Sequence, residues 1–125
     1  MIMNVRHTGI VVSDLTTSLY FYCGLLDFKV VSRMYESGEQ LDNMLGIRGA
    51  QVTTVKLAAP RGGALIELLE FHTPAIKYRR MRELWDIGIS HLALTVDDLE
   101  ADYECMTAAG VEFNSEPQLS GSCKV

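Results

Sequence analysis

The sequence has few of the features that mark several large classes of protein. Its three cysteines, Cys23, Cys105 and Cys123, are odd in number and form no C-x-x-C pair, which argues against a disulfide framework and against a zinc knuckle. Charged residues or glycines interrupt every apolar run well before the roughly 18 residues that a membrane-spanning helix needs. No basic-then-apolar leader precedes the first predicted strand. We therefore expect a soluble protein of the cytoplasm that has no membrane partner.

Positive charge is also scarce. Eleven lysines and arginines are outnumbered by sixteen aspartates and glutamates, which leaves a net charge of −5. Nucleic-acid binding needs a clustered basic surface, and the one basic cluster, KYRRMR at 77–82, is short and typical of a solvated helical connector. We expect no nucleic-acid partner. The 48% of hydrophobic residues among 125 positions is enough to bury the core of one domain.

The chain contains an internal repeat with an offset of 84 residues (91 minus 7). HTGIVVSDL at 7–15 recurs as HLALTVDDL at 91–99, so that a histidine begins each apolar run and Asp-Leu ends it. An amphipathic helical spacing follows each copy, and the same offset pairs Leu15 with Leu99, Leu19 with Tyr103 and Tyr22 with Met106. Each copy therefore predicts a strand followed by a helix.

The predicted elements form two modules of an α+β fold. The helices have N-cap candidates at Ser13 or Asp14 and at Asp97 or Asp98. Strands are predicted at 27–37, 50–59 and 64–71 in the first module and at 111–116 in the second. We expect one domain over 1–125, with a β-α-β-β-β module at 1–72, a connector with a short helix at 73–88, and an incomplete second module at 89–125.

The repeated histidine is the first candidate for a functional role. His7 alternates with Val5 and Val11, and His91 alternates with Ile89, so each imidazole lies in an apolar row. A single inward histidine is more often a buried, hydrogen-bonded core residue. Two equivalent strands with the same imidazole indicate instead that pseudo-twofold symmetry brings the two rings to one metal ion.

A glutamate on the last strand of the first module is the next candidate. Glu67 shares one face of that strand with Leu65 and Leu69, where an ionised carboxylate would cost several kcal/mol unless it is paired or bound to a metal. Glu70 shares the opposite face with Leu68, and periodicity does not choose between the two glutamates. For either one, a strand-end charge that reaches solvent is an equally good interpretation.

The two histidine-headed runs, together with ALIELLEF at 64–71, resemble the vicinal oxygen chelate superfamily over nearly the whole chain. This superfamily includes glyoxalase I, methylmalonyl-CoA epimerase, bleomycin-resistance proteins and extradiol dioxygenases. The resemblance implies paired β-α-β-β-β modules that curl into an open sheet around a divalent metal ion. By position it implies that His7, Glu67 and His91 are metal ligands. The fourth ligand of the family, a glutamate in a D-P-D-G-x-x-x-E-L segment, has no counterpart in this sequence.

The resemblance also implies a reaction. Two imidazoles and a carboxylate suit Zn²⁺, Ni²⁺, Co²⁺, Fe²⁺ or Mn²⁺. In members similar to glyoxalase or the epimerase, which are lyases and isomerases, such an ion binds two neighbouring substrate oxygens and stabilises an enediolate. A glutamate takes the proton α to the carbonyl, and Glu67 is the candidate for that catalytic role. The presence of Glu67 argues against the dioxygenase branch, which usually leaves this ligand position empty.

A second class of function stays open, namely a binding protein of the bleomycin-resistance type. Such a protein has the same fold, binds a drug in the groove between modules and needs no metal. Both classes have a small molecule as the expected partner. We also expect a homodimer, because an unfinished second module leaves strand edges unpaired.

Overall fold

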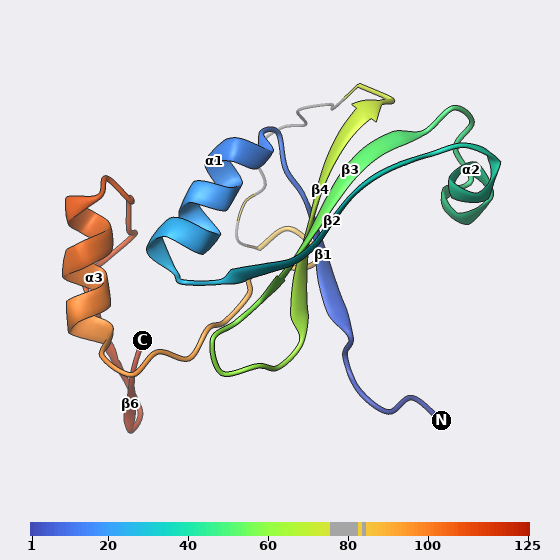
Figure 1. Cartoon of the computed structure of the whole chain (residues 1–125). Helices are drawn as coiled ribbons and strands as arrows, with labels where there is room; N and C mark the ends of the chain where they lie inside the picture. The colour runs from blue at the N-terminus through green and yellow to red at the C-terminus, as the bar shows by residue number, and fades with distance from the viewer. Residues whose placement is uncertain (76–82, 84) are drawn as a thin grey trace. The chain divides into compact units, whose positions relative to one another are not determined.

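A four-stranded sheet organises the first part of the chain (Figure 1). The computed structural model describes residues 1–75, 83 and 85–125, and the chain divides into two units, Met1–Arg79 and Arg80–Val125. The elements of the first unit are β1 (His7–Val11), α1 (Leu15–Leu19), the π-helix η1 (Tyr20–Leu25), β2 (Lys29–Ser37), α2 (Glu39–Leu45), β3 (Gln51–Ala58) and β4 (Leu65–Thr73).

The sheet is mixed, with the strand order β1-β4-β3-β2. β1 pairs in parallel with β4, and the pairs β4–β3 and β3–β2 are antiparallel. The predicted α+β fold and the β-α-β-β-β order of the first module are confirmed, with α2 as an additional helix. Because the first and last strands lie side by side, residues more than fifty positions apart share one region of the sheet.

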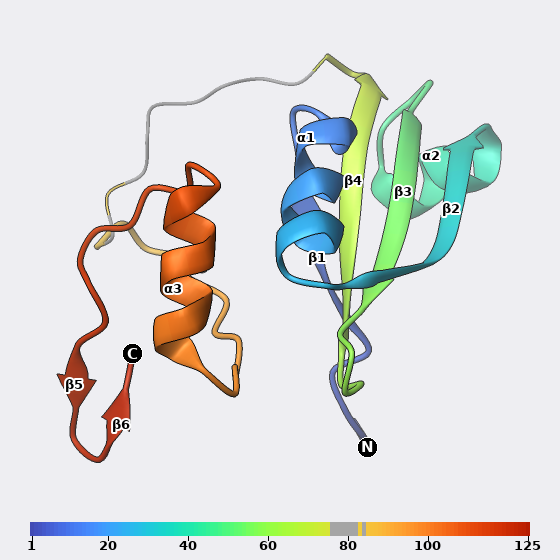
Figure 2. The same cartoon turned by 60° about the vertical axis from the view of Figure 1, so that its left-hand side comes forward.

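One face of the sheet carries the main core, and α1 covers this face (Figure 2). Leu15 from α1 and Phe28 pack with Val55 and Leu57 from β3 and with Ile66 and Leu68 from β4. The helix begins where the sequence predicts, since the Asp14 carboxylate accepts a hydrogen bond from the Thr17 amide. It continues through the π-helical turn as far as Leu25.

A smaller core lies on the opposite face, where Leu41 of α2 packs with Ala50 and Val52. The sequence analysis did not predict α2. The helix is bounded by two glycines with positive φ, Gly38 at 97° and Gly46 at 66°, and Gly46 ends it in the left-handed conformation typical of glycine caps. α2 covers only part of this face. We call the remainder the open face, which is the side of the sheet that carries His7 and Glu67.

The second unit contains α3 (Leu99–Ala108) and a hairpin of β5 (Leu119–Ser120) and β6 (Cys123–Lys124). The helix is confirmed, and Asp98 is its N-cap. The strands predicted at 91–96 and 111–116 are not formed, so those predictions are wrong for this structure. In the first unit β1 has β4 as its strand partner. In the second unit, no strand among the described residues pairs with 91–96.

The predicted connector at 73–88 falls mainly outside the described residues, since 76–82 and 84 are not described. The short helix expected there stays a prediction, as does the division into modules at 1–72 and 89–125. Among the residues that the structure describes, no helix has both the length and the apolar character to cross a membrane.

Candidate metal centre on the open face of the sheet

Three adjacent strands place polar side chains together on the open face. In the strand register, Gly9 of β1 and Lys56 of β3 both pair with Glu67 of β4, and His7 is two residues before Gly9 on the same face. A Cβ atom at Gly9 would lie 3.3 Å from the Cδ1 atom of Leu69, so the Leu69 side chain packs closely against this glycine. The sheet thus gathers an imidazole, a carboxylate and an ammonium from segments that are far apart in sequence.

The Glu67 carboxylate lies between the other two groups. Its Oε2 atom is 3.2 Å from Nε2 of His7, and its Oε1 atom is 3.4 Å from Nζ of Lys56. The side chains of His7, Lys56 and Glu67 are 35%, 27% and 14% exposed, so the carboxylate is the most buried of the three. The sequence analysis required a partner for a carboxylate at this position, and Glu67 has two, His7 and Lys56.

The spacing of His7 and Glu67 fits shared metal ligation. Two ligands bonded at about 2.1 Å to one divalent ion lie roughly 3.0–3.4 Å apart at octahedral and tetrahedral angles. The measured separation of 3.2 Å falls in this range. An imidazole nitrogen and a carboxylate oxygen are also the donor types that Zn²⁺ and its first-row neighbours accept. The two residues therefore fit a divalent metal.

The third predicted ligand, His91, belongs to the second unit. It is exposed, and its Nδ1 atom lies 2.7 Å from the hydroxyl of Ser90. Within the described part of the chain, no three His, Cys, Asp or Glu side chains are grouped as a metal site. The structure thus brings two of the three predicted ligands together, and the role of His91 stays a prediction.

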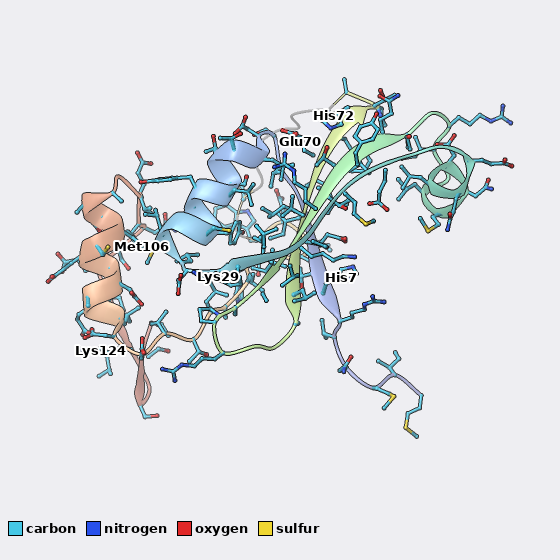
Figure 3. All side chains as sticks on the ribbon, in the orientation of Figure 1. His7, Lys29, Glu70, His72, Met106 and Lys124 are labelled. Carbon is cyan, nitrogen blue, oxygen red and sulfur yellow. The ribbon has the colours of Figure 1, made fainter. Side chains whose placement is uncertain are left out.

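The structure separates the two candidate glutamates. Glu70 lies on the face covered by α1, beside the start of that helix (Figure 3). Its Oε1 atom accepts a hydrogen bond from the backbone amide of Leu15 at 3.1 Å. This amide belongs to the first turn of the helix, where the N–H groups have no partner within the helix. Glu70 therefore has a structural role, and it does not reach solvent as a free strand-end charge.

His7 is more exposed than the sequence pattern indicates. Its apolar row suggested an inward-facing side chain, yet His7 and Val11 are exposed while Thr8 and Ile10 are half-buried. The physical reason is that α1 covers the side of the sheet that carries Ile10, whereas the row of His7 lies on the open face. The interpretation of His7 as a buried core histidine is wrong for this structure.

Sequence reasoning missed Lys56. Its alternation with the buried Val55 and Leu57 was a usable signal, since that pattern puts Lys56 on the face away from the main core. Its contact with Glu67 depends on the β3–β4 register, which local patterns do not provide. A further polar pair lies on this side of the sheet, where the hydroxyl of the buried Thr54 donates to Oε2 of Glu36 at 2.9 Å.

Comparison with known proteins agrees with this architecture. The chain is 31% identical over 98 residues to the uncharacterized protein YaeR of Escherichia coli K12. The aligned residues make up 78% of this chain and 64% of YaeR. The chain thus spans less than two thirds of YaeR. A glyoxalase family protein from Bacillus cereus superposes with a TM-score of 0.88 at 24% identity, covering 99% of this chain and 84% of that one.

The fosfomycin resistance protein FosX of Listeria monocytogenes gives a TM-score of 0.56 at 18% identity, covering 90% of this chain and 74% of that one. A mutant of FosX, with a TM-score of 0.50, was crystallised with Mn(II) and 1S,2S-dihydroxypropylphosphonic acid. Residues 4–122 match the sequence profile described as "Glyoxalase/Bleomycin resistance protein/Dioxygenase superfamily". That match covers nearly the whole sequence, and the chain belongs to this superfamily.

Proposed function

We propose that this chain contributes to a divalent-metal site at which a small carbonyl compound loses the proton α to its carbonyl group. The observation that carries the proposal is the 3.2 Å separation of His7 Nε2 and Glu67 Oε2 on the open face. Superfamily membership supports it, as does the crystallisation of the related FosX with Mn(II). His91 is the proposed third ligand, and the ion is one of Zn²⁺, Ni²⁺, Co²⁺, Fe²⁺ and Mn²⁺.

His7 and Glu67 have separate roles in this proposal. A divalent ion, when bound, would polarise two neighbouring oxygens of the substrate as a Lewis acid. The Nε2 atom of His7 and the Oε2 atom of Glu67 face each other and would hold the ion. The Oε1 atom of Glu67, which lies 3.4 Å from Nζ of Lys56, would accept the substrate proton.

Titration calorimetry with Zn²⁺, Ni²⁺ and Mn²⁺ tests the proposal on the wild-type chain and on two matched variants. Glu67→Gln exchanges a charged oxygen donor for a neutral one and should weaken metal binding by about 10-fold or more. Glu70→Gln, on the opposite face, should leave metal affinity within about 3-fold of the wild type. Circular dichroism checks that both variants fold. Equal losses in the two variants, or no binding by the wild type, would contradict the metal site.

A metal-free binding protein of the bleomycin-resistance type is the second candidate. Val11 and Met34 lie on the open face and are 58% and 48% exposed, which offers apolar surface to a drug-like ligand. This function predicts that neither Glu67→Gln nor Glu70→Gln changes the binding of such a ligand. The same exposed apolar side chains support our proposal of a homodimer. A monomeric mass by light scattering across micromolar concentrations would contradict the dimer.

A further inference from the structure

Lys56 has no role in the metal site proposed above, although it contacts that site directly. Its Nζ atom is 3.4 Å from Oε1 of Glu67, and its side chain is 27% exposed. β3 and β4 are paired along most of their length, so the backbone of Lys56 is held directly beside that of Glu67. The ammonium group is therefore fixed on one side of the carboxylate, with the imidazole of His7 on the other side.

The net charge of this cluster becomes positive when a divalent metal ion is added. A metal-binding imidazole is neutral, so His7, Glu67 and Lys56 together carry no net charge. A divalent ion between His7 and Glu67 raises the total to +2. Part of this charge then lies in a region where the carboxylate is only 14% exposed, and water screens it incompletely. The metal-loaded site consequently favours a ligand that brings negative charge of its own.

We propose that Lys56 binds an anionic group of the substrate, so that the substrates are small organic acids. Such a molecule would present two oxygens on adjacent atoms to the metal and a carboxylate, phosphonate or phosphate group to the ammonium of Lys56. This inference rests on the proposed metal site and specifies its substrate class. Because Lys56 pairs with Glu67 from the β3 side, the anionic group would lie on the β3 side of Glu67.

Oxalate tests the proposal, because it combines two neighbouring oxygens with negative charge and undergoes no reaction. Calorimetry first measures Mn²⁺ affinity and then oxalate affinity for the metal-saturated full chain. We compare the wild type with Lys56→Gln, Lys56→Arg and Lys29→Gln. Lys29 is the matched control, since it is also a strand lysine paired with a carboxylate, that of Asp27, away from the cluster around Glu67.

Lys56→Gln should lower oxalate affinity by about 10-fold or more, and Mn²⁺ affinity should stay equal or rise, because a competing cation beside Glu67 is removed. Lys56→Arg keeps the charge and should retain oxalate affinity within about 3-fold, as should Lys29→Gln. Unchanged oxalate binding in a Lys56→Gln protein that still binds Mn²⁺ would overturn this inference and leave Lys56 as a counter-ion of Glu67. Absence of Mn²⁺ binding in the wild type would overturn the proposed function, and the inference with it.

Discussion

The two glutamates of β4 should have opposite roles, one in folding and the other in binding. Glu70 accepts a hydrogen bond from the Leu15 amide at the start of α1, and Leu15 is 3% exposed in the main core. Glu67 contacts His7 and Lys56 on the open face. We therefore expect that replacing Glu70 lowers the free energy of unfolding, whereas replacing Glu67 mainly lowers metal affinity.

The expected magnitudes follow from the contacts. Glu70→Ala leaves the half-buried Leu15 amide without its acceptor, which costs roughly 1–3 kcal/mol. Glu70→Gln keeps a neutral acceptor and loses only the charge, which costs about 1 kcal/mol. Glu67→Gln breaks a partly exposed ion pair with Lys56, and such pairs contribute at most about 1 kcal/mol. For a unit of this size, about 2 kcal/mol corresponds to a fall in Tm of roughly 10 °C.

Urea unfolding followed by circular dichroism at 222 nm measures these differences on the full chain. The predicted order of destabilisation is Glu70→Ala, then Glu70→Gln, then Glu67→Gln. The result that refutes the reasoning is a Glu67→Gln protein that is less stable than Glu70→Ala. Glu67 would then hold the fold together, and the assignment of the two faces of β4 would be wrong.

Two further predictions concern single groups. Hydrogen bonds from Thr17 hold the pKa of the Asp14 carboxyl below its ordinary value of 3.8, so its stabilising contribution is complete above pH 3.8 and is lost as the pH falls through the lower folded-state pKa. Asp14→Ala should therefore flatten the acid limb of a stability-against-pH curve, and an unchanged limb would refute this. Burial raises the pKa of the Cys23 thiol, against an opposing effect of Lys29, while Cys105 is exposed. Mass spectrometry should show iodoacetamide modifying Cys105 before Cys23 in the folded chain, and the reverse order would contradict the burial argument.

Local elements of the chain were predictable where they depend on neighbours in sequence. The helix starts are an example, since Asp14 and Asp98 cap amides only three residues away. The choice between Glu67 and Glu70 was not predictable. Both faces of β4 carry leucine, so alternation identifies two faces without showing which one a helix covers. The packing of α1 decides which face of β4 is covered. Leu15 of α1 lies in the same core as Leu68, so Glu67, on the other face, lies on the open face.

The second copy of the repeat shows that local sequence does not determine whether a strand forms. The runs at 7–11 and 91–95 have similar patterns, yet only the first is a strand, because a strand is stabilised by a partner that its own sequence does not specify. Lys56 is a related case, since its position on the open face follows from alternation while its contact with Glu67 follows from the register. Local patterns thus predict which residues are candidates for the site, and the pairing of distant strands decides which of these side chains contact one another.

Amide hydrogen exchange at one matched pair of residues tests whether strand formation depends on a partner strand. Val12 and Val96 occupy the same position in the two copies. The Val12 amide donates to the carbonyl oxygen of Leu69 at 2.9 Å, while the structure describes no strand around Val96. Exchange requires that such a bond open first. At low micromolar concentration, and relative to the intrinsic rate of each amide, Val12 should therefore exchange at least about 100-fold more slowly than Val96.

A concentration series separates the two ways in which Val96 could become protected. If a second copy of the chain pairs with the run at 91–96, protection of Val96 should rise with protein concentration while that of Val12 stays constant, which would support the proposed dimer. Slow exchange of Val96 at every concentration would contradict the argument, because the run would then have a strand partner within its own chain. The description of 91–96 without a strand would then be wrong.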